Sequence, residues 1–353
     1  MKELNIERKP TQKRILGLIG AALRVKWFQL FLIALVLGII VYIINDGFLS
    51  RGNIRNLMRG MVVPGLMIVA VGPLLAGGGI DLAAAGQATL GSVFFANLMV
   101  FFPGMPWGVA AIITMVLGAV FGIINVFFVN KMNFSAFIVT IAMGMLYQGL
   151  TQAWTGFAEV PIWRDSLIEL GRLSVFNEWV PVLFIVVLLI VAAYVFMMAK
   201  TKFGRSIYMT GGNEAATRLA GINPKKVRGI LFVNSGIMAT LAGVAWSSQN
   251  RLAHPTSIVT NAPNFTALTA VIIGGVSFRG GSGSLAAGFF GLVVVRLFEN
   301  GLMMAGFRTY VNVAAQGVIL VVALIGDHIS VVRQRQALIK ASMEITVSKA
   351  EKP

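Results

Sequence analysis

The feature that most constrains this chain is a series of apolar runs, each close to the length that crosses a bilayer. A transmembrane helix needs about 20 consecutive apolar residues. The run WFQLFLIALVLGIIVYII, which begins at Trp27, is one of several that approach this length. The chain is 57% hydrophobic and only 12% charged, with a mean hydropathy of +0.83. These values are typical of a polytopic membrane protein, so we expect an all-α helical bundle in the membrane.

We place about ten transmembrane helices along the sequence, with ends defined to within a few residues. The spans are 27–45, 57–77, 82–101, 107–129, 134–153, 180–199, 228–248, 265–278, 284–305 and 309–326. The span 265–278 is short, which is typical of a broken or partly re-entrant helix. The run at Trp27 is too long for the core of a signal peptide, so we retain it as the first span.

The net charge of +16 reflects membrane topology and not affinity for nucleic acid. With the N-terminus inside, most of the 29 Lys and Arg residues lie on the inner side, as the positive-inside rule requires. The opposite orientation inverts that ratio, so we expect both termini in the cytoplasm. Arg51, Arg55 and Arg59 are an exception on the outer side. We expect them on an interfacial amphipathic helix between Asp46 and Gly60.

We divide the chain into three segments. Residues 1–26 form a basic cytoplasmic segment whose cations attract anionic lipid headgroups. Residues 27–326 form the transmembrane domain, interrupted by a cytoplasmic loop at 200–228. Residues 327–353 form a cytoplasmic tail, which we expect to lose regular structure beyond Ser342.

The sequence carries no motif for catalysis or nucleotide hydrolysis. No GxxxxGK[ST] phosphate cradle occurs, and GGSGSLAAG at 280–288 lacks the lysine that such a cradle needs. HExxH and a GxSxG elbow with partners are also missing. The chain has no cysteine, and its two histidines, His254 and His328, are far apart, so no metal site is indicated. We expect a transport subunit that is not an enzyme and holds no cofactor of its own.

A charged, turn-rich island interrupts the apolar runs at 201–228, TKFGRSIYMTGGNEAATRLAGINPKKVR. Such an island cannot lie in lipid, so it is exposed to water. Asn213 is placed to cap a short helix, Glu214 lies where the helix dipole favours a negative charge, and Gly221 is a left-handed stop. Asn223 followed by Pro224 begins the next span. A rigid rod of about 10 Å on a membrane protein is a docking element.

Glycine pairs interrupt the apolar runs at matching places in two halves of the chain, 57–153 and 228–326. The first break contains Gly78 and Gly79, and the second contains Gly274 and Gly275. Such breaks indicate a pathway at the membrane midplane between two repeats. The alternative is that the glycines only allow helices to pack closely.

A few polar side chains inside the spans are candidates for a hydrated route. Asp81 follows the first break and is either the cap of a helix at a water-exposed tip or the inner end of a substrate pathway. Arg296 and Glu299 are three residues apart on one helix, so they can neutralise each other within the bundle or lie near the outer mouth of the pathway. The residues that we select for the pathway are Asp81, Asn125, Gln148, Asn234, Thr269, Glu299 and Asn300. Each can equally well bond a neighbouring helix.

Five sequence blocks strengthen the interpretation of the island. They are GGGIDLAAAGQATLGSV, NVFFVNKMNFSAFIVTIAMGMLYQGL, GGNEAATRLAGINPKKVRGILFVNSGIMATLAGV, ALTAVIIGGVSFRGGSGSLAAGFFG and FENGLMMAGF. In this order they run from about residue 54 to 326, and they resemble the ribose/xylose/galactose-type sugar permease family of bacterial ABC importers. The third block resembles the cytoplasmic coupling loop of that family and the helix that follows it.

The resemblance implies a multi-pass permease subunit of the inner membrane, in a homodimer or paired with another permease. A cytoplasmic ABC ATPase, which holds the ATP and Mg²⁺, would drive it, and a periplasmic or lipid-anchored solute-binding protein would deliver the solute. The residues that the resemblance assigns to the ATPase contact are Gly211, Gly212, Asn213, Glu214, Ala216, Arg218, Gly221 and Ile222.

Three departures from the family pattern bear on the solute. Leu-Ala-Ala-Ala-Gly follows Asp81 where the family has Leu-Ser-Val-Gly, Ser135 stands where a proline is usual, and Glu299 replaces a common Asn. We therefore expect a monosaccharide or a related polyol, not specifically an aldopentose. A nucleoside, an autoinducer or a branched-chain amino acid remains open as the solute. A stand-alone secondary carrier or channel is the alternative outside this class, and it predicts transport without any ATPase.

Overall fold

The computed structural model describes residues 25–163, 171 and 173–350 of the 353-residue chain. The basic segment predicted at 1–26 therefore lies almost wholly outside the described residues. The described part is helical apart from two pairs of short antiparallel strands. These are β1 (Val160–Pro161) with β4 (Leu252–Ala253), and β2 (Ser174–Val175) with β3 (Val180–Pro181). The all-α architecture predicted from the apolar runs is confirmed.

Nine helices in the described part of the chain are long and apolar enough to cross a membrane. They lie in α2 (Lys26–Ile44), α3 (Arg51–Ala76), α4 (Ala84–Phe101), α5 (Trp107–Val126), α6 (Ala136–Thr155), α8 (Val182–Lys200), α11 (Pro224–Asn250), α14 (Leu285–Met304) and α15 (Thr309–Ala350). A shorter apolar segment, formed by α12 (Ser257–Asn261) and α13 (Pro263–Ile273), takes the place of the predicted short span. Helix α5 continues into the π-helix η2 (Phe127–Lys131). The other predicted spans agree with these helices to within a few residues, except at the start of α3.

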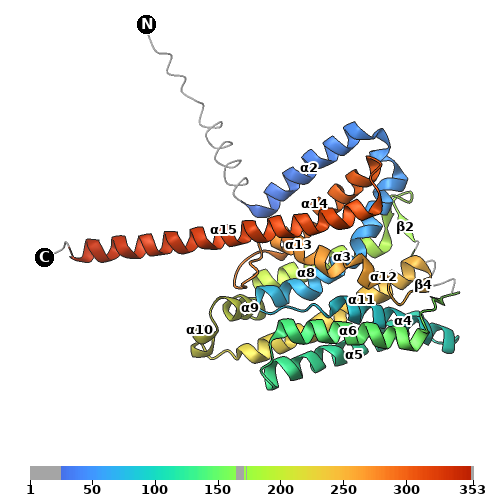
Figure 1. Cartoon of the computed structure of the whole chain (residues 1–353), viewed down its shortest axis with the longest axis horizontal. Coiled ribbons are helices and arrows are strands. Elements are labelled where there is room, and N and C mark those ends of the chain that lie inside the picture. Colours follow the sequence, from blue (N-terminus) through green and yellow to red (C-terminus); the bar gives the residue numbers. More distant parts are fainter. Residues whose placement is uncertain (1–24, 164–170, 172, 351–353) are drawn as a thin grey trace, which may run out of the picture.

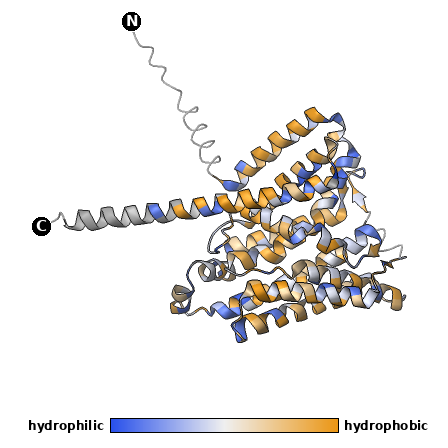
Figure 2. Cartoon of the chain, viewed as in Figure 1, coloured by the Kyte–Doolittle hydropathy of each residue, from blue (hydrophilic) through white to orange (hydrophobic). Residues whose placement is uncertain are grey.

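Helix α3 is the central element of the bundle. Every residue from Met61 to Ala76 is buried, and α8, α11, α13 and α14 pack around the helix (Figure 1). Helices α2 and α15 lie at the periphery and keep apolar side chains exposed, as Ile43 on α2 does. Figure 2 colours the apolar residues of these two helices orange. A water-soluble protein would bury so large an apolar surface, and here the lipid covers it.

Glycine allows the closest helix crossings. A Cβ added to Gly118 on α5 would lie 2.8 Å from the carbonyl carbon of Gly236 on α11, closer than real Cβ contacts. A Cβ added to Gly274, at the end of α13, would lie 2.5 Å from the Cα of Gly288 on α14. Small residues at such crossings bring two backbones together. Of the predicted break residues, Gly274 has such a packing contact, and a pathway at the breaks stays a prediction.

The predicted interfacial helix between Asp46 and Gly60 is wrong. A short 3₁₀ helix, η1 (Asp46–Leu49), precedes Ser50, whose hydroxyl oxygen accepts a hydrogen bond from the backbone N–H of Asn53 at 3.3 Å. Helix α3 starts directly after this cap and continues without interruption into the membrane span. Arg51 and Arg55 lie on its first turns and pair with Glu178 at 3.6 and 3.4 Å.

The expected loss of structure beyond Ser342 is also contradicted. Helix α15 continues through this residue to Ala350. The segment from Ser330 to Ala350 contains neither glycine nor proline, so a helix already nucleated in the membrane propagates through it at little cost. Figure 1 shows α15 projecting beyond the bundle at the end that carries α9 (Lys202–Gly212) and α10 (Glu214–Leu219).

Candidate functional site

The island at 200–228 folds into two short helices at one end of the bundle (Figure 1). The side chain of Asn213 accepts a hydrogen bond from the backbone N–H of Ala216 at 3.0 Å and so caps α10, as predicted. Gly221 follows the helix with φ +77°, the left-handed conformation that glycine adopts without strain. Asn223 caps α11 in the same way, by accepting from the N–H of Lys226 at 3.2 Å.

Sequence reasoning missed α9, because glycines in its sequence argue against a helix. The signal that could have found it is Thr201, whose hydroxyl oxygen caps the helix by accepting from the N–H of Gly204 at 3.1 Å. A Cβ at Gly204 would lie 2.5 Å from the carbonyl oxygen of Met197. The glycine is therefore needed for α9 to fold back against the end of α8.

Glu214 ties α10 to the start of α11. Its carboxylate accepts a hydrogen bond from Arg228, in the first turns of α11, and a second one from Arg218 at 2.6 Å. These two guanidinium donors, with Arg228 the stronger, hold the pKa of Glu214 below its usual range. The pair with Arg228 joins two helices, whereas the pair with Arg218 lies within α10. Glu214 and Arg228 therefore attach α10 to the start of α11.

The outward face of α10 carries small side chains and one large apolar side chain. Leu219 is 91% exposed, and Ala215 and Ala216 on the same face are exposed as well. Thr217 on the opposite face is buried. Leu219 was not among the predicted contact residues, although its spacing of three and four residues from the two alanines already places it on their face. An exposed leucine on a capped helix is suited to a groove in a partner protein.

Gly211 and Gly212 differ in their surroundings. A Cβ at Gly211 would collide with the carbonyl oxygen of Ala76, at the end of α3, and would lie 2.5 Å from the backbone nitrogen of Gly281. Gly212 is exposed, and a Cβ there would meet only the Cα of Gly281 at 3.7 Å. Gly211 therefore belongs to the packing between α9, α3 and the loop that follows α13. Gly78, at the first predicted break, also packs against Gly211.

Asp81 is buried, with 1% of its surface exposed. One carboxylate oxygen accepts from the N–H of Ala83 at 2.9 Å, and the other accepts from the hydroxyl of Ser235 on α11 at 2.7 Å. It therefore holds the start of α4 against the middle of α11. The interpretation of Asp81 as a cap at a water-exposed tip is wrong, because the close contact with α11 excludes water from the carboxylate.

The residues selected for a pathway do not gather in one place. Most of them bond a neighbouring helix or loop, or their own helix. Asn234 donates to the carbonyl of Val69 at 3.0 Å, Gln148 to that of Pro255 at 3.0 Å, Thr269 to that of Phe265 at 2.8 Å, and Asn300 to the side chain of Asn53 at 2.8 Å. Asn125 is fully buried in α5. A pathway along these residues stays a prediction.

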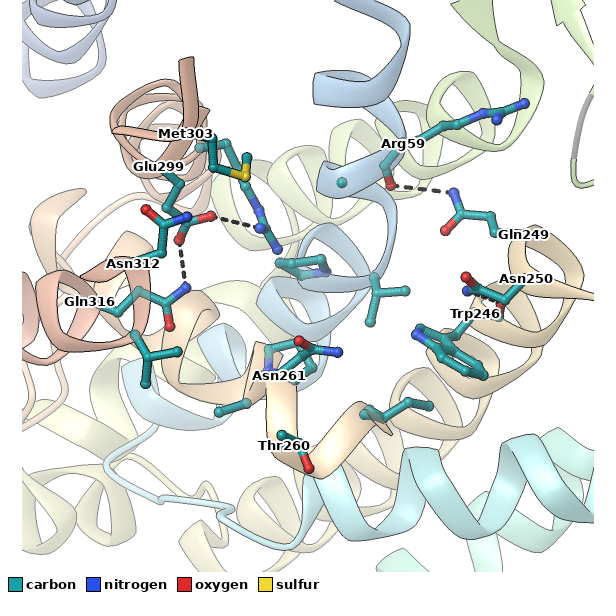
Figure 3. Close-up of a pocket in the computed structure, with 18 residues that line it drawn as sticks. Arg59, Trp246, Gln249, Asn250, Thr260, Asn261, Glu299, Met303, Asn312 and Gln316 are labelled. Atoms are coloured by element: carbon teal, nitrogen blue, oxygen red, sulfur yellow. Dashed lines mark hydrogen bonds and ion pairs between the residues drawn. The ribbon is translucent and has the colours of Figure 1, made fainter. Parts of the chain in front are cut away.

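Glu299, a member of that set, lines a cavity. This distal cavity lies between α3, α11, α12, α14 and α15 and has a volume of about 480 Å³ (Figure 3). Helix α11 starts beside α10, and its last turn lines the cavity, so the two sites are at opposite ends of this helix. The carboxylate of Glu299 accepts from Arg296 at 2.7 Å and from the amide nitrogen of Gln316 at 2.7 Å.

Across the cavity from this group, α11 contributes Trp246, Gln249 and Asn250 (Figure 3). Asn261 at the end of α12 and Asn312 near the start of α15 complete a wall of amides. In the described residues, no cluster of three or more His, Cys, Asp or Glu side chains is suited to a metal ion. The cavity therefore offers hydrogen bonds and one aromatic surface.

Comparison with known proteins identifies the class of this membrane protein. The permease family described as "Branched-chain amino acid transport system / permease component" matches residues 55–324. The chain belongs to this family of ABC transporter permeases.

Three relatives extend the match. The probable ABC transporter permease protein YphD of Escherichia coli K12 is 30% identical over 308 residues, covering 87% of this chain and 91% of that protein. The ribose import permease protein RbsC of Bacillus subtilis 168 is 30% identical over 309 residues, with 84% and 91% covered. The xylose transport system permease protein XylH of E. coli K12 is 27% identical over 356 residues, with 83% and 90% covered. No solved structure matches the chain.

These matches define the chain as an ABC importer permease of the carbohydrate-uptake type. It is a multi-pass membrane protein, homologous to inner-membrane ABC permeases. It is the transport subunit and not the catalytic one, because ATP hydrolysis in an ABC importer resides on the ATPase. An importer of this class also requires a solute-binding protein.

Proposed function

We propose that this chain moves a monosaccharide or a related polyol across the inner membrane, as one of two paired permease subunits. In this proposal both termini and the 200–228 loop are cytoplasmic, and the distal cavity lies on the outer side. The partners are a cytoplasmic ABC ATPase and a periplasmic or lipid-anchored binding protein. ATP and Mg²⁺ belong to the ATPase.

The observation that carries the proposal is the linkage of α10 to α11 through Glu214 and Arg228. Helix α10 presents Leu219 outward for a partner, and its opposite side is attached to the transmembrane bundle. Closure of an ATPase pair on ATP would displace α10, and the ion pair would displace the start of α11. The mechanism needs only rigid helices and one strong contact between them.

A second connection leads from the same loop to the rest of the bundle. Gly211 on α9 packs against the end of α3 and against Gly281, and the backbone N–H of Gly281 donates to the carbonyl of Ala76 at 2.8 Å. Movement of the loop therefore acts on α3 and on the segment that leads into α14. Because α3 and α14 both line the distal cavity, the loop is coupled to it.

Two observations support a sugar or polyol as the solute. The relatives include permeases whose names specify ribose and xylose. The charged groups Arg296 and Glu299 neutralise each other beside the cavity, so an amino acid would find no free counter-charge there. These arguments favour an uncharged solute over the branched-chain amino acid that the family description mentions.

A Leu219→Asp variant tests the ATPase contact. Because Leu219 is 91% exposed, the substitution removes an apolar contact without disturbing the core. We expect wild-type chain expressed in its host to co-purify with an ABC ATPase and to support ATP-dependent uptake of labelled sugar, and we expect the variant to lose both. The matched control is Leu173→Asp at the opposite end of the bundle, where the side chain is 49% exposed.

Retention of the ATPase by Leu219→Asp together with unchanged uptake would refute the role of α10. Uptake that continues without any ATPase and follows an ion gradient would instead favour the stand-alone carrier. Competition with unlabelled ribose, xylose, a polyol, a nucleoside and leucine identifies the solute class. Inhibition by leucine alone would contradict the carbohydrate assignment.

A further inference from the structure

We propose that the distal cavity is a binding site for the solute itself, built to hold an uncharged polyhydroxylated ring. The permease would then select its solute a second time, after the solute-binding protein has released it. The inference rests on the proposed function for the identity of the solute, and its geometry stands on the residues that line the cavity.

The size of the cavity and its backbone suit a ligand site. A volume of about 480 Å³ falls within the range of about 300–1,000 Å³ for small-molecule sites. Its floor is the junction of α12 and α13, where Ala262 adopts the left-handed conformation with φ +44°. This conformation is unfavourable for a residue with a side chain, and such strain is concentrated at ligand sites. Thr260 and Asn261 directly precede this residue and are among those that line the cavity.

Two of the three charged side chains that line the cavity neutralise each other. Arg296 forms a 2.7 Å ion pair with Glu299, and Figure 3 shows the side chain of Arg59 directed away from the cavity. A zwitterionic amino acid or an anionic sugar acid needs an uncompensated opposite charge when it leaves water. The distal cavity does not supply one among the described residues, so an uncharged ligand is favoured.

The polar groups of the cavity include acceptors of hydrogen bonds that have free capacity. A carboxylate has about four lone-pair sites, and Glu299 uses two of them, for Arg296 and Gln316. The oxygen Oδ1 of Asn312 is buried and accepts no hydrogen bond within the described residues. Hydroxyl groups are the donors that such a set satisfies, and two adjacent hydroxyls match the two oxygens of one carboxylate.

Three further amides are held in fixed orientations. Gln249, Asn250 and Asn261 each donate to a backbone carbonyl, at 3.3, 2.8 and 2.8 Å. An amide that is anchored through one N–H presents its oxygen and its second N–H without a further loss of side-chain freedom, which favours binding. The face of Trp246 completes the site, because an aromatic ring packs against the C–H face of a sugar ring while the hydroxyl edge meets the amides.

The absence of cysteine from the chain allows a direct test. Thr260→Cys introduces a single thiol at the cavity, and Gly104→Cys introduces one in an exposed turn, where a Cβ meets nothing within 4 Å. The full-length variants are reconstituted in nanodiscs without ATPase or binding protein. The rate of maleimide labelling is then measured with ribose, xylose, gluconate or leucine in solution.

We expect ribose or xylose to slow the labelling of Thr260→Cys and to leave Gly104→Cys unaffected. At a sugar concentration of ten times the Kd, the rate falls about elevenfold, because only the unoccupied sites react. Gluconate and leucine should protect weakly or not at all. Adding Asn312→Leu, a substitution of similar volume, should weaken the protection by sugar while the labelling rate without sugar stays unchanged.

Several results would overturn the inference: no protection by any sugar, equal protection of Gly104→Cys, protection by leucine alone, or a thiol at Thr260→Cys that the reagent never reaches. None of these depends on the ATPase. Sugar protection with ATP-independent uptake would refute the proposed function and leave the cavity as a sugar site. ATP-driven sugar uptake without protection would support the proposed function and refute the cavity as a sugar site.

Discussion

The adjacent glycines of α9 give a prediction with an internal control. In Gly211→Ala the new methyl group collides with the carbonyl oxygen of Ala76 and lies 2.5 Å from the nitrogen of Gly281. Both contacts are backbone atoms, which cannot move aside as a side chain does. In Gly212→Ala the nearest atom is the Cα of Gly281 at 3.7 Å, an ordinary van der Waals distance. Both glycines lie in the same helix.

The two substitutions are expected to change the free energy of unfolding in opposite directions. Overpacking costs about 1–3 kcal/mol, and two rigid backbone contacts place Gly211→Ala toward the upper end. Replacing glycine by alanine in a helix returns up to about 1 kcal/mol, which leaves a net loss of about 1–2 kcal/mol. Gly212→Ala has only the favourable contribution. At about 2 °C per kcal/mol, the Tm of Gly211→Ala falls by about 2–4 °C and that of Gly212→Ala stays the same or rises.

The assay is thermal unfolding of the purified variants, followed by intrinsic fluorescence, together with ATP-dependent uptake in proteoliposomes that contain the ATPase. Because Gly211 joins α9 to α3, uptake per ATP hydrolysed should fall in Gly211→Ala and stay at the wild-type value in Gly212→Ala. Equal Tm values and equal uptake in the two variants would refute the close packing of α9 against α3 and its role in coupling.

Three further predictions concern carboxylates. Glu214→Gln loses the ionic part of its bond with Arg228, so uptake should fall while Tm changes by about 2 °C or less, since exposed ion pairs contribute about 0–1 kcal/mol. Because the pKa of Glu214 is lowered in the folded protein, the stability from this pair is complete above the ordinary carboxyl pKa and disappears only as the pH falls through the lowered value. A pH series of uptake that declined already near neutral pH in the wild type, and not in the variant, would contradict this. Asp81→Leu leaves the donors of Ser235 and the backbone unpaired, at about 1–3 kcal/mol each, so its Tm should lie below that of Asp81→Asn; equal Tm values would show that the two hydrogen bonds contribute little. Glu178→Gln should change Tm by less than about 2 °C, because its side chain is 60% exposed and exposed pairs contribute little. A larger loss of Tm would show that the ion pairs of Glu178 with Arg51 and Arg55 stabilise the start of α3.

Features that depend on neighbouring residues could be predicted from the sequence. The spans follow from the length of the apolar runs, and the caps of α10 and α11 follow from Asn213 and Asn223. The pair of Arg296 with Glu299 follows from their spacing of three residues on one helix. In each case the relevant partner lies within one or two helical turns.

Features that depend on contacts between helices could not be predicted. Gln316 completes the Glu299 group from a different helix, and Ser235 reaches Asp81 across 154 positions of sequence. A polar residue in a span satisfies its hydrogen bonds with whichever helix packs against it, and the spacing along its own helix does not identify that helix. Helix α9 was missed for a related reason, because its glycines lower the helix propensity and their purpose is a contact with α3 and α8.

Helix α11 connects the two candidate sites directly. Its 27 residues correspond to a length of about 40 Å, from the ion pair with Glu214 at its first turns to Trp246 and Asn250 at the distal cavity. Gly229, Gly236 and Gly243 recur every seven residues along it and so form one narrow stripe. Gly236 packs against α5 and Gly243 packs against α4. Small residues at these crossings bring the backbone of α11 close to both neighbours. A displacement of α11 by α10 would move the wall of the cavity that carries Trp246, and binding of solute at that wall is then expected to change the docking of the ATPase reciprocally.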